Sequence, residues 1–171
     1  RITIPGFGDD VRAPSDAERA AIARAPSPDS ALRASLALGR TEGAGEALAA
    51  TIMRPALNLR GIRGGAVGAG AANAVPTEAT ASIDFRLVPD QQPARVRALV
   101  EAHLRARGWH VVHARPDAAA RAAHPRVAWL QWEDGYAAQR TAIDHPFARA
   151  VVRVATDALG EAPVEIPTLG G

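Results

Sequence analysis

The stretch NAVPTEATASIDFRLVP (residues 73–89) predicts the central strand of the chain. From Thr77 onward, apolar residues occupy every second position, which is the period of a β-strand with one buried face. The apolar face carries Ala79, Ala81, Ile83, Phe85 and Leu87, and the opposite face carries Glu78, Thr80, Ser82, Asp84 and Arg86. We therefore expect a half-buried strand that follows an Asn-x-x-Pro corner and whose open face ends on an arginine.

Elements on either side of this strand extend the prediction to a fold class. Residues 56–60 alternate in the same way, and only the Gly- and Ala-rich run 64–73 separates them from the central strand, so we expect the two strands to be antiparallel. A helix with one apolar stripe follows from Pro93 to a capping glycine, Gly108. The run WHVVHA (residues 109–114) predicts a further strand. This order is most of a βαββαβ unit, a ferredoxin-like open-faced sandwich of the α+β class with helices on one face of an antiparallel sheet.

The two ends of the chain have weaker patterns. Ser15 to Glu18 fits a capping box that starts a short helix, and scattered turn residues then predict an insertion with broken helices up to residue 55. Near the other end, RVAWLQW resembles a strand. Asp144 is a candidate cap for a second amphipathic helix that ends at Gly160, and PVEIP (residues 163–167) predicts a short strand.

Composition excludes several classes of protein. All 20 basic residues are arginine, but 18 acidic residues leave a net charge of only +2, so the isoelectric point near 10.3 is weak evidence for nucleic-acid binding. The absence of cysteine excludes disulfides and thiolate metal sites and agrees with a reducing cytoplasm. No run approaches the ~18 apolar residues of a membrane span. We expect a cytoplasmic protein that binds neither nucleic acid nor membrane.

Motifs for catalysis and metal binding are missing from the sequence. The Gly-rich run lacks the Gly-Lys-Ser/Thr ending of a phosphate loop, and no G-x-S-x-G elbow is present. The five histidines do not follow a metal-ligand spacing, so we expect neither a metal site nor a catalytic residue within this chain. RNA-binding sheets stack bases on exposed aromatic residues, whereas Phe85 belongs to the buried face of its strand.

Two polar residues near the central strand have structural as well as functional interpretations. Arg86 is two residues from Asp84 on the same face, so the two can form a surface salt bridge that contributes little. Asn73 precedes Pro76 and suits a turn. The pattern alone favours these structural roles over a binding role.

Four segments in order resemble one enzyme family. They are RPALNLRGIRGG (54–65), NAVPTEATASIDFRLVPDQQP (73–93), the GY-x-A-x-R-T-x-x-D-H-P run (135–146) and PTLGG (167–171). Together they resemble the di-zinc metallopeptidases, which include carnosinase-type dipeptidases, aminoacylases, acetylornithine deacetylases and glutamate carboxypeptidases. In that family a ferredoxin-like lid is inserted into an α/β catalytic domain that holds two zinc ions.

The resemblance implies a division of the chain and a set of substrate contacts. Residues 1–55 would be the insertion within the lid, 56–134 the lid and dimerisation domain, and 135–171 the start of the return into the catalytic domain. The zinc ligands have no counterpart here, so the chain alone is expected to be inactive and to be a piece of a longer enzyme. The residues that match substrate-binding positions of the family are Asn73, Arg86, Gly170 and Gly171.

These positions would hold the carboxylate and the scissile carbonyl of a dipeptide or N-acyl amino acid, in a homodimer formed through the lid. The alternative is a free-standing, non-catalytic ligand-binding or dimerisation module with the same sandwich. Coding sequence on both sides of the chain distinguishes the two interpretations, because an upstream H-x-D segment and a downstream His ligand belong only to the enzyme.

Overall fold

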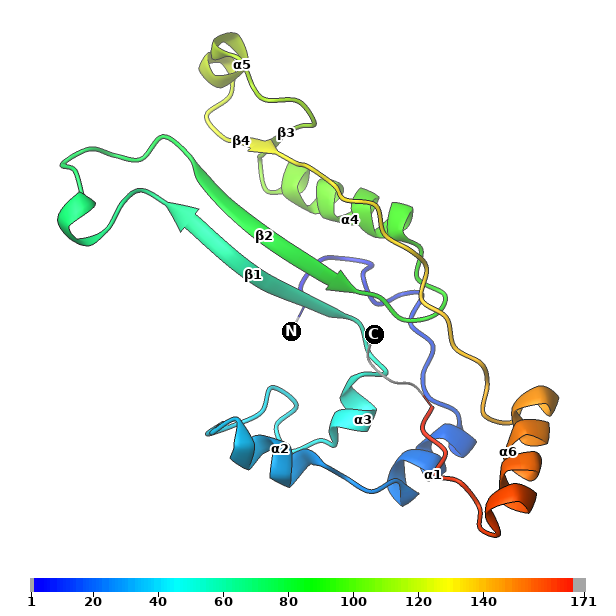
Figure 1. The fold of residues 1–171 in the computed structure, drawn as a ribbon. Helices are drawn as coiled ribbons and strands as arrows, with labels where there is room; N and C mark the ends of the chain where they lie inside the picture. Colours follow the sequence, from blue (N-terminus) through cyan, green and yellow to red (C-terminus); the bar gives the residue numbers. More distant parts are fainter. Residues whose placement is uncertain (1, 168–171) are drawn as a thin grey trace.

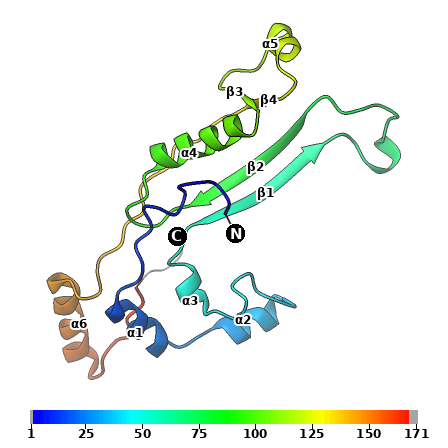
Figure 2. The same ribbon diagram turned by 180° about the vertical axis from the view of Figure 1, so that it is seen from behind.

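The computed structural model describes residues 2–167 and shows an α+β chain built around a long β-hairpin (Figure 1). The helices are α1 (Asp16–Arg24), α2 (Asp29–Ser35), α3 (Leu48–Thr51), α4 (Pro93–Ala106), α5 (Ala118–Ala123) and α6 (Pro146–Leu159), with a 3-10 turn at Gly68–Gly70. The strands are β1 (Ala56–Gly64), β2 (Ala79–Arg86), β3 (His110–Val112) and β4 (Val127–Trp129). The hairpin and α4 form one arm, and α1, α2, α3 and α6 gather beyond the base of the hairpin (Figures 1 and 2). None of the described helices is long and apolar enough to cross a membrane.

The hairpin pairs β1 and β2 antiparallel, as the sequence predicts. The register joins Leu57 to Phe85, Leu59 to Ile83 and Ile62 to Ala81. A bulge lies between Leu59 and Gly61. Because a bulge inserts one extra residue into one strand, it returns Ile62 to the apolar face that Leu57 and Leu59 already occupy.

Burial of the apolar face is limited to the inner end of the hairpin. Phe85 is half-buried, and its ring lies 6.2 Å from that of Phe7 and 6.0 Å from that of Trp132. Farther out, Ile83 is 49% exposed and Ile62 is 74% exposed. The prediction of a regularly buried face is therefore wrong for the outer half, because no other described helix or strand makes an extensive contact with the hairpin there.

Helix α4 begins and ends where the sequence predicts, but the strand that follows it pairs differently from the prediction. Pro93 begins the helix, Val96 is buried, and Gly108 takes a left-handed φ of 82° just after the helix ends. The next strand, β3, pairs in parallel with β4. The chain from β3 to β4 contains α5, which is the kind of crossover that a parallel pair needs. The described strands thus form two two-stranded sheets instead of one antiparallel sheet.

The N-terminal helices are short, as the capping box and the turn residues predict. Ser15 and Glu18 form the capping box that the sequence indicates, with the Ser15 amide donating to Glu18 Oε2 at 2.7 Å and the Glu18 amide donating to Ser15 Oγ at 3.2 Å. Helices α2 and α3 are short and interrupted by turns. Local capping chemistry is therefore sufficient to place the start of α1.

The C-terminal region corrects two predictions. Pro146 is the first residue of α6, so the capping position falls on His145, whose Nδ1 accepts from the Phe147 amide at 3.2 Å, and Asp144 is not the cap. The helix ends at Gly160, with φ 76°, as expected. Residues 163–167 form no strand, and two of these five residues are prolines, which have no amide to donate to a ladder.

A small core lies at the base of the hairpin, where the N-terminal segment crosses it. The buried apolar residues are Phe7, Ala21, Met53, Val88 and Val96. Two polar residues are buried with them, Glu18 and Gln91. Gln91 Nε2 donates to the Phe7 carbonyl at 2.8 Å, and Gln91 Oε1 accepts from the Val88 amide at 3.2 Å. This amide side chain therefore joins the N-terminal segment to the loop after β2.

Candidate functional site

Arg86 ends β2 on the open face of the hairpin. Its neighbour Phe85 points towards Phe7 and Trp132, and successive side chains of a strand point to opposite faces. The Arg86 side chain is 60% exposed, and its Nε lies 3.0 Å from Asp84 Oδ2. The salt bridge with Asp84, which the sequence analysis gave as the structural role of Arg86, is thus present. The Arg86 side chain is nevertheless accessible from solvent.

Asn73 lies in the loop of residues 65–78 that joins the two strands at the far end of the hairpin (Figure 1). It is exposed. Strand β2 has eight residues, so at about 3.3 Å per residue roughly 25 Å of strand separates this loop from Arg86. The structure does not bring Asn73 and Arg86 of one chain together. The other two predicted contacts, Gly170 and Gly171, lie outside the described residues.

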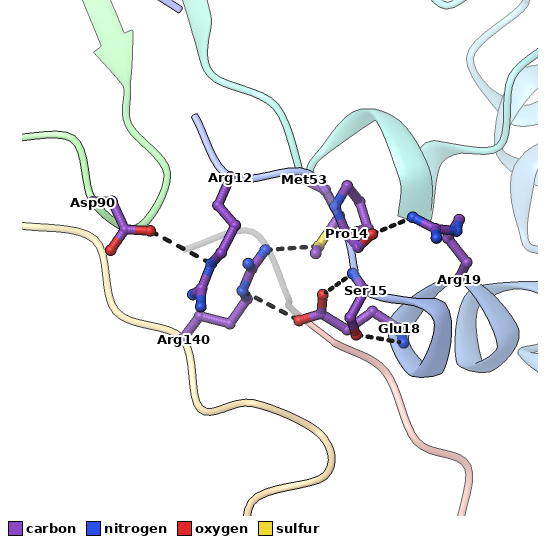
Figure 3. A network of polar contacts seen from close by, with 8 residues as sticks. All are labelled: Arg12, Pro14, Ser15, Glu18, Arg19, Met53, Asp90 and Arg140. Atoms are coloured by element: carbon purple, nitrogen blue, oxygen red, sulfur yellow. Dashed lines mark hydrogen bonds and ion pairs between the residues drawn. The ribbon is translucent and has the colours of Figure 1, made fainter. Parts of the chain in front are cut away.

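A buried polar cluster, which sequence reasoning missed, joins three segments at the base of the hairpin (Figure 3). The Arg140 and Glu18 side chains are only 4% and 5% exposed, and Arg140 Nε lies 3.3 Å from Glu18 Oε1. The Arg140 NH1 group lies 3.9 Å from Met53 Sδ. Two signals pointed to these residues, since Glu18 belongs to the capping box and Arg140 to the R-T-x-x-D-H-P run. Neither signal indicated that the two would meet.

A polar groove of about 470 Å³ lies next to this cluster. It is lined by Arg12, Pro89, Asp90, Gln92, Ala138, Gln139, Arg140 and Thr141. Arg12 Nε lies 3.4 Å from Asp90 Oδ2, which ties the N-terminal segment to the loop after β2 (Figure 3). Both groups are largely exposed, so this ion pair alone contributes little to stability.

The described residues do not provide a metal site. No group of three or more His, Cys, Asp or Glu side chains within residues 2–167 could hold a metal ion. His110 and His124 stack face to face with ring centroids 3.7 Å apart, an arrangement in which both rings are used for packing. His113 Nε2 lies 3.4 Å from Glu101 Oε1. A catalytic zinc needs about three protein ligands that converge on one point, and this part of the chain does not fit that requirement.

Comparison with known proteins identifies the chain's relatives. The family model for a peptidase dimerisation domain matches residues 13–110. Among solved structures, the chain is similar to the M20 family metallo-carboxypeptidase Sso-CP2 from Sulfolobus solfataricus, with 26% identity and a TM-score of 0.68 over 98% of this chain. It also shares the fold of the di-peptidase Dug1p from Saccharomyces cerevisiae, with 17% identity and a TM-score of 0.56 over 98% of this chain. It spans 40% and 34% of those two chains. A search of curated proteins found no match.

Proposed function

The chain belongs to the M20 metallopeptidase family through its peptidase dimerisation domain, and we propose that it supplies the lid of a hydrolase that cleaves amide bonds of dipeptides or N-acyl amino acids. The observation that carries this proposal is the similarity to a metallo-carboxypeptidase over 98% of the chain. Within the lid we assign residues 1–55 to an insertion and 56–134 to the dimerisation domain. Residues 135–171 begin the return into the catalytic domain.

The proposed role of Arg86 is to bind the carboxylate of the substrate. A guanidinium presents a planar pair of donors that matches a carboxylate, and such charge-assisted pairs are stronger than neutral hydrogen bonds. The open face of the hairpin leaves the Arg86 side chain accessible, and Asp84 at 3.0 Å holds it in place until a substrate carboxylate competes for it. This exchange keeps the guanidinium paired in both states.

Asn73 would meet the same substrate only from a second copy of the chain. The length of β2 keeps Asn73 and Arg86 of one chain roughly 25 Å apart, which is longer than a dipeptide. A homodimer formed through the lid can bring the loop of one copy to the Arg86 end of the other. A carboxamide there can donate to the oxygen that becomes negative as the amide is attacked.

The metal, which we propose to be zinc, would be bound outside the described residues, because these do not fit a metal site. Gly170 and Gly171 remain proposed backbone contacts to the substrate. The lack of cysteine agrees with a cytoplasmic location, which we also propose.

Hydrolysis assays on the whole protein test the proposal. With Zn²⁺ present, it should release free amino acids from a panel of dipeptides or N-acyl amino acids, and a chelator should abolish the release. The 171-residue chain alone should be inactive and should retain no zinc after dialysis against a weak chelator. The rival function, a non-catalytic ligand-binding or dimerisation module, predicts no turnover by the whole protein under any of these conditions.

A further inference from the structure

The connection from β4 to α6, residues 130–145, crosses the molecule without helix or strand (Figure 1). Helix α6 at its end has no extensive packing against another described helix or strand. The large apolar side chains of α6 that remain exposed are Phe147, Val151, Val154 and Leu159. The position of α6 therefore depends on how the segments on either side of it are held.

Two arginines and Trp132 hold the connection. The Trp132 ring packs against Phe85, and its Nε1 donates to Glu101 Oε1 at 3.3 Å. Near the start of the connection, Arg97 of α4 donates to the Glu133 carbonyl at 2.6 Å, in an exposed contact.

Near the end of the connection, shortly before α6, Arg140 reaches Glu18 on α1 and Met53 ahead of β1. The contact of Arg140 with Glu18 is buried on both sides. Arg140 thus joins the connection to two elements that are far from it in the sequence.

The buried Arg140–Glu18 pair contributes little net stability, but it is well suited to fixing the position of the connection relative to α1. Two charges removed from water lose solvation that their attraction repays only with good geometry. Here Arg140 Nε makes no hydrogen bond within the described residues, although it lies 3.3 Å from the carboxylate. The carboxylate itself is fixed, because the Ser15 amide holds Glu18 Oε2 at 2.7 Å. Arg140 must therefore come to one point on α1 if the Glu18 charge is to be compensated.

We propose that Arg140 is a positioning residue whose buried ion pair with Glu18 locks the connection against α1 and fixes the direction in which α6 leaves the hairpin arm. Met53 also contacts the Arg140 guanidinium, at 3.9 Å from its NH1 group. In the hydrolase proposed above, the same connection leads from the lid back to the catalytic domain, so the lock would set the resting orientation of the lid. Only that last consequence rests on the proposed function, since the lock concerns this chain alone.

Spin-label distances can test the lock, because the sequence contains no cysteine and pairs of introduced cysteines are the only labelled sites. Arg63→Cys on β1 and Asp157→Cys on α6 report the position of α6 relative to the hairpin, and both sites are exposed. The labelled chain with Arg140 and Glu18 unchanged should give one narrow distance peak. Glu18→Gln keeps an oxygen for the Ser15 amide but removes the charge, and we expect the single peak to be lost.

Two control variants separate the lock from general destabilisation. Ser15→Ala removes the hydroxyl cap of α1 and leaves the ion pair, so Tm should fall by about 3 °C while the distance peak stays narrow. Arg149→Met removes an exposed ion pair with Glu165 within the C-terminal region and should also leave the peak unchanged. Arg140→Lys keeps the charge but loses the planar fork, so its α6 distance peak should be broader than that of the unaltered chain and narrower than that of Glu18→Gln.

A second label pair makes every outcome decisive. Arg63→Cys with Ala102→Cys reports the hairpin against α4, within the arm itself. The lock is supported if Glu18→Gln broadens the α6 distance and leaves this internal distance narrow. An unchanged α6 distance overturns it. Broadening of both distances, or loss of cooperative unfolding, also overturns it, because the pair would then serve packing of the whole chain and not the direction of α6.

Discussion

The base of the hairpin and its outer half have similar sequence patterns but differ in burial. At the base, even charged and amide side chains such as Glu18 and Gln91 are buried, each with named partners. In the outer half, isoleucines at regular strand positions face solvent. Alternation in a sequence therefore shows which side of a strand is apolar, whereas burial depends on what lies against that side.

Removal of the Met53 side chain, which is 2% exposed and lies beside Arg140, should show the largest difference in stability between the two regions. Met53→Ala should lower the free energy of unfolding by about 3 kcal/mol, because it deletes buried methylene groups and leaves a cavity. Denaturant unfolding monitored by circular dichroism measures this change. The matched change in the outer hairpin, Ile62→Ala, should cost less than about 0.5 kcal/mol. Equal losses at the two sites would show that the base is not the stable part of the chain.

Gln91 gives the next largest effect, because its amide bridges two backbone groups. Gln91→Ala should cost about 2 kcal/mol, since the Phe7 carbonyl and the Val88 amide lose their partner in a buried place. The adjacent Gln92→Ala is the control and should change stability by less than about 0.5 kcal/mol, because Gln92 is exposed. Thermal unfolding of both variants at one pH measures the two changes. Equally small losses would show that the Gln91 amide does not stabilise the chain by bridging the two backbone groups.

A charge on the outer hairpin gives the smallest expected effect on folding and tests the proposed dimer. Ile62→Glu should leave the stability of the single chain within about 0.5 kcal/mol, because Ile62 is 74% exposed. If the hairpin contacts a second copy in the whole protein, the same change should weaken self-association measured by sedimentation. A whole protein that stays dimeric with Ile62→Glu would place its dimer contact elsewhere.

Local chemistry made several parts of the structure predictable. The capping box at Ser15, the proline start of α4 and the glycine end of α6 each depend on residues close together in sequence. The hairpin register is also local, because one loop joins its strands. The β3–β4 pair and the contact of Arg140 with Glu18 were not predicted, because they depend on packing between distant segments, which no period or spacing records.

The candidate site was predictable only in part, for the same reason. The strand period placed Arg86 on the open face and identified its pairing with Asp84 as one outcome. The distance of Asn73 from Arg86 follows from the length of the hairpin, which the motif alone did not make evident. A motif therefore identified residue types, whereas the structure determined which of them one chain can bring to the same ligand.

The most direct test of the proposed substrate role is kcat/KM of Arg86→Ala beside Asp84→Ala in the whole protein. Loss of the carboxylate contact should lower kcat/KM about a hundredfold for Arg86→Ala, and Arg86→Lys should recover part of the loss. Asp84→Ala should have a much smaller effect, and each change should cost at most about 1 kcal/mol of stability, since the pair is exposed. If Arg86→Ala keeps the kinetics of the unaltered protein, Arg86 does not bind the substrate and the salt bridge is its role.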